Sequence, residues 1–476
     1  MDSFALVVFG ITGNLSQIKL IPVLYDLFDK NLLPAKFIVA GIGRKPYSKS
    51  EFRNFILEVL ARKNRHHHRA IDPETADKLL RNMLYLQGDV NDKKSAKKVY
   101  SSLKKIIETN TFSNIIFYLA TYPDLYDKIF KSIAHSKLNA RKNGWTRLII
   151  EKPIGRDLPS ANVLDSLLRK YFSEDQIFRL DHYLGKETLQ NLLIFRFNNG
   201  IFEHLMNRKH VSQIQITASE DFGIGERGRY YDSIGALRDV GQNHLLQMLA
   251  LSTMDPPRQF SNEAVTAERV KILKVLKPFP DKVVFGQYNG YLYEENIDKN
   301  SQTETFFALK TEVRNSRWRG VPIYIRAGKK LVRWVTEIKI VFKVAEDRLF
   351  SKFDLGDKPN VLTYRVQPDE GIGLDVLIKR PGHKMLLNSY PMYFSYPASN
   401  LEIPDAYERL FYDAFSGDQT FFTDAQEVQE GWRFVDALLE MKRKVSLYQP
   451  DSWGPKEADE LLEADGNSWI EPQSGS

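Results

Sequence analysis

The densest group of chemically useful side chains in this sequence lies in RLDHYLGKE, at residues 179–187. It places four such side chains close together: Asp181, His182, Tyr183 and Lys186. Histidine, tyrosine and lysine beside the start of a helix can bind a phosphomonoester dianion through charge-assisted hydrogen bonds. The aspartate can orient a histidine supplied by another segment. The alternative is a charged loop that joins two domains.

A second group lies in RDVGQNHLLQML, residues 238–249, where helical spacing of leucines carries Asp239 and His244. A histidine that accepts a proton near neutral pH needs such a half-buried position and a carboxylate partner. A histidine that only fills the core is the alternative. Glu220 in ASEDFG ends a predicted strand, which suits a carboxylate that binds sugar hydroxyls.

Lys152 lies in EKPIG, at the end of a predicted parallel strand, where open α/β sheets bind their ligands. The next residue, Pro153, allows a turn with a cis peptide bond. A surface lysine with no ligand is the alternative for Lys152.

A glycine-containing turn, GITGNL at residues 10–15, follows the predicted strand at residues 5–9. Small residues let the backbone approach a pyrophosphate, and the helix that follows offers free N–H groups. The Gly-x-x-Gly spacing is weaker than the full Gly-x-Gly-x-x-Gly pattern, and a tight turn without a ligand is an equal alternative.

The end of the second predicted strand favours one coenzyme over the other. NAD enzymes place an acid there for the ribose hydroxyls, whereas this segment carries Arg44 and Lys45 and no acid. A cation suits a 2′-phosphate, so the sequence predicts NADP rather than NAD; a solvated basic loop is the alternative.

The elements that must position these residues fall into two regions. Apolar runs at 5–9, 37–42, 83–87, 114–120 and 147–153 alternate with helical stretches, which predicts a doubly wound, Rossmann-like α/β domain over residues 1–180. Strands at 211–219, 282–288, 304–313, 321–328, 336–344 and 375–380 lack such helices between them. They predict a larger α+β domain, residues 181–476, with a mostly antiparallel sheet and helices at 186–207, 231–253 and 421–442.

The composition excludes several classes of protein. The net charge of +7 in 476 residues is spread along the chain, which argues against nucleic-acid binding. There is no cysteine, so disulfides and thiol nucleophiles are excluded. No apolar run approaches the ~18–20 residues of a membrane span, and a cytoplasmic protein without membrane contact is expected. The tract His66–His68 is interpreted as a solvated helix end, and no metal site is predicted.

Taken in this order, the motifs resemble those of the glucose-6-phosphate dehydrogenase family. The resemblance runs from Gly10 to the GWRF segment near 431 and includes EKPIGRDL, IRAGKKL and DAYERL at 405–410. RLDHYLGKE is the most specific motif, since it differs from the usual form only by Leu180 in place of isoleucine.

The resemblance implies oxidation of β-D-glucose 6-phosphate at C1 to 6-phospho-D-glucono-1,5-lactone with hydride transfer to NADP, the first step of the oxidative pentose phosphate pathway. It implies His244 as general base and Asp181 as its carboxylate partner. The substrate-binding residues that it implies are Lys152, His182, Tyr183, Lys186, Glu220, Asp239 and Lys329. The implied coenzyme-binding residues are Gly10, Ile11, Thr12, Gly13, Asn14, Leu15, Lys19, Arg44, Asp89, Val90, Tyr126 and Lys152. It also implies a homodimer or homotetramer.

The sequence departs from the family pattern at two places. Trp334 stands where the family usually has a basic residue, and the segment 121–123 reads Thr-Tyr-Pro instead of Leu-Pro-Pro. Two alternatives are another NADP-linked sugar-phosphate dehydrogenase of the glucose–fructose oxidoreductase type and a catalytically silent paralogue that binds NADP or partners. The first would not be expected to carry RLDHYLGKE, and the second would be favoured by loss of His244, Asp181 or Lys186, all of which are present.

Overall fold

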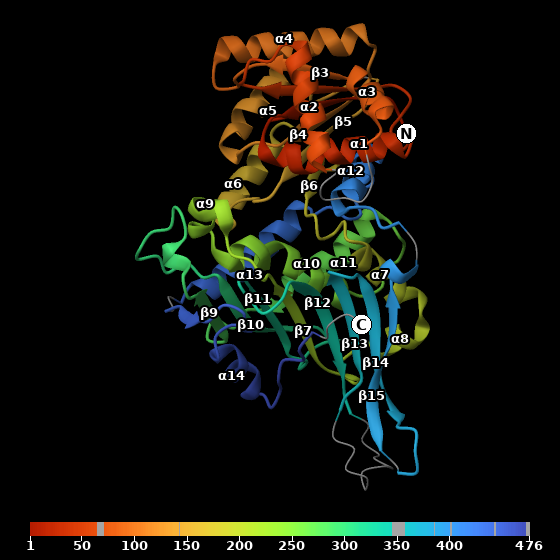
Figure 1. The fold of residues 1–476 in the computed structure, drawn as a ribbon, viewed down its shortest axis with the longest axis vertical. Coiled ribbons are helices and arrows are strands. Elements are labelled where there is room, and N and C mark those ends of the chain that lie inside the picture. The colour runs from red at the N-terminus through yellow and green to blue at the C-terminus, as the bar shows by residue number, and fades with distance from the viewer. Residues whose placement is uncertain are drawn as a thin grey trace. The chain divides into compact units, whose positions relative to one another are not determined.

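The computed structural model describes residues 1–63, 71–141, 143–344, 358–384, 386–399, 402–441 and 444–472 (Figure 1). The tract His66–His68 lies outside them. The chain forms two compact units. The first unit comprises Met1–Gly155, Pro159–Gly185 and Pro404–Ala425, and the second comprises Arg156–Leu158, Lys186–Ile403 and Gln426–Ser476. The segment Pro404–Ala425 therefore clusters with the N-terminal part of the chain, although it lies far from it in sequence.

The first unit contains, among the described residues, a six-stranded sheet in the order β3-β2-β1-β4-β5-β6, with every neighbouring pair parallel. Its strands are β1 (Phe4–Phe9), β2 (Phe37–Gly43), β3 (Met83–Gln87), β4 (Asn114–Leu119), β5 (Thr146–Glu151) and β6 (Ile177–Leu180). The central strands are buried along their whole length, because helices cover both faces of the sheet. The predicted doubly wound fold is confirmed.

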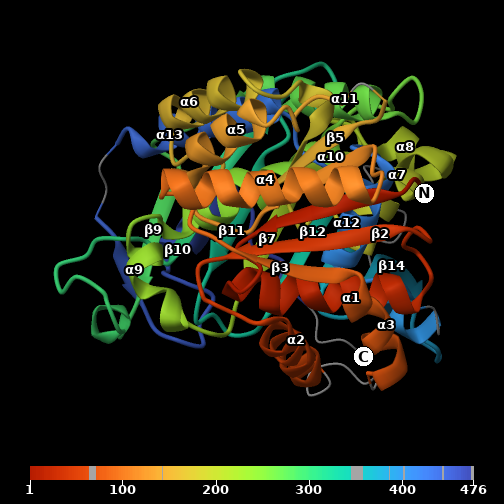
Figure 2. The same cartoon turned by 90° about the horizontal axis from the view of Figure 1, so that it is seen from above.

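The helices of the first unit lie on the two faces of this sheet, with α4, α5 and α6 on one face and α1, α2 and α3 on the other (Figure 2). The helical segments are η1 (Ser16–Leu20), α1 (Ile21–Asp29), α2 (Lys49–Lys63), α3 (Pro73–Arg81), α4 (Lys93–Thr109), η2 (Pro123–Leu125), α5 (Tyr126–His135), α6 (Leu158–Arg169), η3 (Glu174–Gln176) and α12 (Ala406–Ser416).

Helix α12 brings the C-terminal half of the chain into the first unit, where it contacts α1. It begins at Asp405, whose carboxylate accepts from the backbone N–H of Tyr407 at 2.8 Å. It ends at Gly417, which adopts the left-handed conformation (φ 94°) that glycine tolerates best. This helix was not predicted from the sequence.

The second unit contains a larger sheet in the order β15-β14-β13-β12-β7-β11-β10-β9-β16, with β8 paired to β10. Its strands are β7 (Val211–Ser219), β8 (Leu276–Lys277), β9 (Val283–Tyr288), β10 (Phe306–Val313), β11 (Ile323–Gly328), β12 (Val335–Phe342), β13 (Val361–Gln367), β14 (Gly371–Lys379), β15 (Leu387–Ser395) and β16 (Ser446–Tyr448). The pairs β7–β11 and β9–β16 are parallel, and the other pairs on this path are antiparallel. The predicted mostly antiparallel sheet is confirmed.

The second unit has helical segments on both faces of this sheet. They are α7 (Glu187–Asn198), α8 (Gly200–Leu205), η4 (Gly225–Arg227), α9 (Gly228–Asp232), η5 (Leu237–Leu245), α10 (Leu246–Thr253), α11 (Asn262–Lys274), η6 (Tyr291–Tyr293), η8 (Pro397–Ser399), α13 (Ala425–Leu439) and α14 (Glu457–Glu463). Phe307 of β10 points toward Gly241 of η5, whereas its neighbour Phe306 packs in the cluster that includes Leu462 of α14. Successive strand residues face opposite sides, so η5 and α14 lie on opposite faces.

Two predicted helices are interrupted in the structure. The helix predicted at 186–207 is divided into α7 and α8, because Asn199 adopts an extended conformation (φ −112°, ψ 95°). The helix predicted at 231–253 is divided into α9, η5 and α10, and Gly235 lies between the first two with φ 77°. No helix of the described residues is long and apolar enough to cross a membrane.

Candidate functional site

The glycine-containing turn after β1 is held close to two neighbouring strands. The N–H of Gly10 donates to the carbonyl of Ile42 at 3.0 Å, and the hydroxyl of Ser16 donates to the carbonyl of Gly10 at 3.0 Å. Gly10 has φ 88°, and a Cβ atom there would lie 2.4 Å from the carbonyl oxygen of Ala120. Only glycine fits this position without displacing the backbone, so the turn packs directly against the end of β4.

A pocket of about 420 Å³ opens beside this turn, at the carboxyl ends of the first unit's strands. It is lined by six of the predicted coenzyme residues: Gly10, Thr12, Gly13, Arg44, Asp89 and Val90. Arg44 is exposed at the end of β2, where the lining includes no acid from that strand. The hydroxyl of Tyr85 donates to the carbonyl of Lys45 at 2.6 Å and holds the loop that carries Arg44.

The other predicted coenzyme residues lie around the pocket rather than in its lining. Ile11 is buried toward Gly41, while Asn14 and Leu15 lead into η1. Lys19 lies in η1, a π-helical segment, and its ammonium group is 5.1 Å from the ring centre of Tyr407. Tyr126 is 1% exposed and packs in the core of the first unit.

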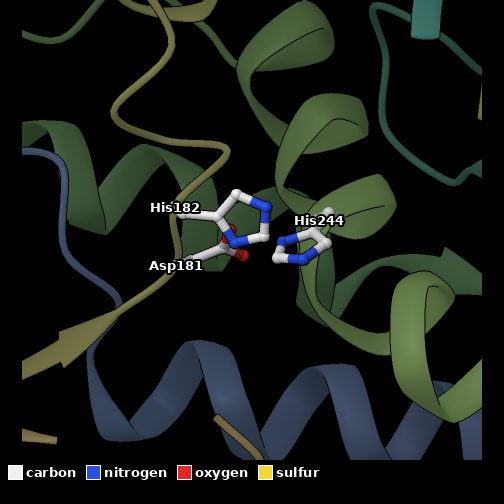
Figure 3. A group of neighbouring side chains, drawn as sticks. All are labelled: Asp181, His182 and His244. Carbon is white, nitrogen blue, oxygen red and sulfur yellow. The ribbon is translucent and has the colours of Figure 1, made fainter. Parts of the chain in front are cut away.

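The predicted catalytic residue Asp181 and the predicted substrate residues Lys152 and His182 follow the ends of β5 and β6. Glu151 and Leu180, the last residues of these strands, are register partners, so Lys152 and Asp181 begin from adjacent points of the sheet edge. The Lys152–Pro153 peptide bond is cis, as the sequence suggested. Figure 3 shows the side chains of Asp181 and His182 after β6, and that of His244 on its own helix.

Asp181 and its neighbours are held by local contacts. The carboxylate of Asp181 is buried and accepts from the N–H of Tyr183 at 3.0 Å. The imidazole of His182 stacks on the ring of Tyr407, with ring centres 5.8 Å apart and planes inclined by 15°. A Cβ atom on Gly185 would lie 2.3 Å from the carbonyl oxygen of Ala406, so the RLDHYLGKE motif needs glycine where it meets α12.

A buried carboxylate that sequence reasoning did not identify lies directly before Lys152. Glu151 is 8% exposed, and the hydroxyl of Tyr118 donates to it at 2.8 Å. The hydroxyl of Tyr407 forms a second hydrogen bond with it. Burial raises the pKa of Glu151 to about 7, although both hydrogen bonds and the positive charge of Lys152 oppose the rise. The sequence signals that could have identified this carboxylate are Glu151 of EKPIG and Tyr407 of DAYERL, and neither residue was assigned a role.

In the second unit, Glu220 and Lys329 form an ion pair at the ends of β7 and β11. The ammonium group of Lys329 also lies 5.4 Å from the ring centre of Phe222 and 5.3 Å from that of Tyr231. Lys186 lies 3.9 Å from the carboxylate of Glu370. These contacts fix the positions of the two ammonium groups.

The segment that carries Asp239 and His244, η5, is a π-helix, in which the N–H of Leu246 donates to the carbonyl of Gly241 five residues earlier. Such wide turns are frequent at functional sites because they redirect side chains. His244 is 2% exposed, and Asp239 is buried with Arg227 at 3.5 Å from its carboxylate.

Trp334, the departure from the family pattern, is 41% exposed at the start of β12. The preceding Arg333 donates from its guanidinium group to the carbonyl of Pro472 at 3.1 Å.

The doubly wound sheet, the glycine-containing turn and the pocket at the strands' carboxyl ends define a protein of the dinucleotide-binding class. Comparison with known proteins gives the particular family. The model of the glucose-6-phosphate dehydrogenase NAD binding domain matches residues 7–191, and that of the glucose-6-phosphate dehydrogenase C-terminal domain matches residues 193–470. This chain belongs to the glucose-6-phosphate dehydrogenase family.

Relatives of similar length support this assignment. Glucose-6-phosphate 1-dehydrogenase of Chlamydia muridarum is 38% identical over 98% of this chain and 96% of its own. The Bacillus subtilis enzyme of the same name is 38% identical over 98% of this chain and 97% of its own. The crystal structure of the Mycobacterium avium enzyme is similar with a TM-score of 0.90 and 33% identity, over 100% of this chain and 99% of that one. A glucose-6-phosphate dehydrogenase in complex with its substrate, glucose 6-phosphate, has a TM-score of 0.90 and 32% identity over 98% of each chain.

Proposed function

We propose that this protein oxidises β-D-glucose 6-phosphate at C1 to 6-phospho-D-glucono-1,5-lactone, the first step of the oxidative pentose phosphate pathway, with NADP as coenzyme. Family membership across both parts of the chain carries the proposal, together with the relative whose structure contains glucose 6-phosphate. The chemistry requires a hydride acceptor, a base for the C1 hydroxyl proton and cations for the phosphate.

The pocket residues fit NADP. Gly10, Thr12 and Gly13 line the pocket, and the tight turn that only glycine allows at Gly10 suits a backbone that approaches a pyrophosphate. Arg44 is exposed in the pocket lining and can pair with a 2′-phosphate. When bound, NADP accepts the hydride that leaves C1. Asn14, Leu15, Lys19 and Tyr126 stay predicted coenzyme contacts, which the family resemblance supports.

We propose His244 as the general base and Asp181 as its carboxylate partner. The base takes the proton of the C1 hydroxyl, the oxygen forms the carbonyl of the lactone, and the hydrogen on C1 leaves with its electron pair. A buried imidazole suits this role, because the surroundings exclude water that would compete for the proton. Asp181 would stabilise the imidazolium that forms. No metal takes part in this proposal.

We assign the substrate's phosphate to the cationic and hydroxyl groups that follow β6, and its sugar hydroxyls to carboxylates of the second unit. His182, Tyr183 and Lys186 supply hydrogen-bond donors that match a dianion. Glu220 and Asp239 can accept from sugar hydroxyls, and Lys152 and Lys329 supply further positive charge.

The test measures NADPH formation by absorbance, with glucose 6-phosphate and either NADP or NAD. We expect His244→Asn to lower kcat at least ~10²-fold, as for loss of a general base, while substrate binding stays nearly intact. His204→Asn is the matched control, since His204 is exposed on α8. Equal kcat values for wild type and His244→Asn would contradict the assignment. Folded wild-type protein that reduces neither coenzyme would favour the silent paralogue.

The coenzyme preference has its own test. Arg44→Ala should weaken NADP binding by roughly 1.5–3 kcal/mol, as for a hydrogen bond to a charged group, and leave NAD binding nearly unchanged. Arg81→Ala, an exposed arginine at the end of α3, is the control. Parallel losses for both coenzymes would argue against a 2′-phosphate contact.

A homo-oligomer is part of the proposal. Tyr390, Met392 and Phe394 alternate along β15 on one face, and they are 41%, 64% and 48% exposed. Such an exposed apolar patch is typical of a protein interface, and a second copy of this chain is the proposed partner. Met392→Glu should shift the mass measured by light scattering to that of a smaller species; an unchanged mass would contradict this face as the interface.

The cytoplasmic location stays a prediction.

A further inference from the structure

The carboxylate of Glu151 occupies a position that links the coenzyme turn with the phosphate-binding motif of the first unit. It ends β5, and the hydroxyls of Tyr118 from β4 and Tyr407 from α12 both form hydrogen bonds with it. Tyr118 is fully buried and Tyr407 is 7% exposed. The carboxylate is therefore held by two elements that lie far apart in sequence.

The ring of Tyr407 contacts one residue predicted to bind the coenzyme, Lys19, and one predicted to bind the substrate, His182. The ammonium of Lys19, from the segment after the coenzyme turn, lies 5.1 Å from its centre. The imidazole of His182 stacks on it at 5.8 Å. A cation over an aromatic ring and a stacked imidazole both depend on the orientation of that ring. A ring that rotates about χ1 would move away from both partners.

We propose that Glu151 is a positioning residue, which fixes the Tyr407 ring through its hydroxyl group and thereby holds His182 and Lys19 for substrate and coenzyme. This inference rests on the proposed function, because it assigns a role in that reaction. In that reaction Glu151 does not contact the reacting atoms, because it acts through Tyr407.

The protonation state of Glu151 decides how well it performs this role. An ionised carboxylate accepts from both tyrosine hydroxyls, whereas a neutral carboxyl group must donate its own proton and offers fewer acceptor sites. The titratable groups that face it come from every neighbouring element: Tyr118 of β4, Tyr126 of α5, Tyr407 of α12, Lys152 and Asp181. Lys152 favours the ionised form and Asp181 opposes it. With a pKa near 7, both forms are populated in neutral solution.

The decisive variant is Glu151→Gln, which copies the shape and hydrogen-bonding of the neutral acid. We expect kcat/KM for glucose 6-phosphate to fall roughly tenfold at about pH 8.5, as for loss of a hydrogen bond to a charged group, chiefly through a higher KM. At about pH 6, where wild-type Glu151 is itself largely neutral, the variant should be within about twofold of wild type. A residue that only supports the fold would not show this dependence on pH.

Tyr407→Phe keeps the ring and removes the hydroxyl, and it supplies a second test. We expect a similar loss at about pH 8.5, and we expect the double variant Glu151→Gln/Tyr407→Phe to be no worse than either single variant, because both changes break the same contact. The controls are Tyr100→Phe and Asp413→Asn. Tyr100 is buried and donates to the carbonyl of Ile129 at 3.3 Å, and Asp413 is a buried carboxylate of α12 whose pKa burial raises to about 6.

The outcomes separate this inference from the proposed function. Wild-type protein that does not reduce NADP with glucose 6-phosphate contradicts the proposed function, and this inference fails with it. Active wild type with folded Glu151→Gln and Tyr407→Phe variants within twofold at both pH values contradicts the inference alone. Equal losses at both pH values, or losses that multiply in the double variant, also overturn it.

Discussion

Two buried glutamates, one in each compact unit, have the pKa of their carboxyl groups raised by burial to about 7, yet different groups hold them. Glu151 in the first unit is bound by the side-chain hydroxyls of Tyr118 and Tyr407. Glu304 in the second unit accepts from the backbone N–H of Leu237 at 3.2 Å, and its own carbonyl accepts from the N–H of Ala236 at 3.0 Å.

The two carboxylates differ in whether side chains or the backbone supply their hydrogen-bond donors. Glu304 binds the first residues of η5, whose N–H groups need an acceptor whatever their side chains are. Glu151 depends on two particular tyrosines from β4 and α12. A change at either tyrosine removes a hydrogen bond to Glu151, whereas the donor to Glu304 is a backbone N–H, which does not depend on the side chain of Leu237. We infer that Glu151 controls the orientation of the Tyr407 ring in the proposed site, whereas Glu304 holds the start of η5, the helix that carries His244.

The largest expected effect tests what the two glutamates share. An unfolded glutamate ionises near 4.5 and each folded one near 7, so between these pH values the unfolded state has lost a proton that the folded state retains. Stability therefore falls as pH rises from about 4.5 to 7, by roughly 3 kcal/mol for each group, and stays lower above 7. Glu151→Gln and Glu304→Gln should each remove one such loss, measured by urea unfolding at about pH 5 and pH 8.

The exposed Glu295→Gln serves as the control, because water reaches its carboxylate in the folded and the unfolded state alike. If both buried-site variants followed the wild-type pH dependence, neither glutamate would remain protonated in the folded protein near neutral pH.

A smaller expected effect tests how closely Glu304 packs against the backbone at Gly235. Gly235 has φ 77°, and a Cβ atom there would lie 2.4 Å from a carboxylate oxygen of Glu304. Gly235→Ala should lower the free energy of unfolding by about 2–3 kcal/mol, from the left-handed conformation and the clash together. Gly225→Ala has φ 55° and no atom within 4 Å of the added Cβ, so we expect only ~1 kcal/mol there. Equal losses in urea unfolding would mean that Glu304 moves aside freely.

The smallest expected effect tests the hydrogen bond from the side chain of Tyr118 to Glu151. Tyr118→Phe should cost about 2 kcal/mol at pH 8, where Glu151 is mostly ionised, and about 1 kcal/mol at pH 5, where it is neutral. Tyr100→Phe removes a hydroxyl that donates to a neutral carbonyl, so its cost should be about 1 kcal/mol at both pH values. Unfolding midpoints of the two variants at both pH values decide this. A pH-independent loss in Tyr118→Phe would show that its hydroxyl does not respond to the charge of Glu151.

Much of the fold could be predicted because its signals are local. The strands at β1, β3 and β4 are continuous apolar runs that end close to their predicted limits. The strands β13 and β15 were not predicted; β15 is largely exposed, so its residues do not show the pattern of a half-buried strand. The predicted helix at 231–253 is interrupted at Gly235, which has a positive φ and lies so close to the carboxylate of Glu304 that a Cβ atom would not fit.

The candidate site divides in the same way. The glycine-containing turn is one contiguous segment, so its residue types and spacing were sufficient to predict a tight turn at Gly10 and Gly13. That this turn binds a phosphate stays a proposal. The family motifs similarly identified Asp181 and His244, whose roles stay proposals. Glu151 was missed as a functional residue, because its partners Tyr118 and Tyr407 follow no shared periodicity and lie in separate motifs.

The doubly wound sheet, the glycine-containing turn, the cation at the end of β2 and the family could all be inferred from the sequence, since each depends on residues that are neighbours in the chain. Three features could be known only from the folded chain: α12 joins the first unit, η5 is a π-helix, and Glu151 is enclosed by two tyrosines. These features depend on burial and on hydrogen bonds between segments that are distant in sequence, and no local pattern of residues records which segments will meet. For Glu151, burial raises the carboxyl pKa, while the hydrogen bonds from the two tyrosines oppose that rise.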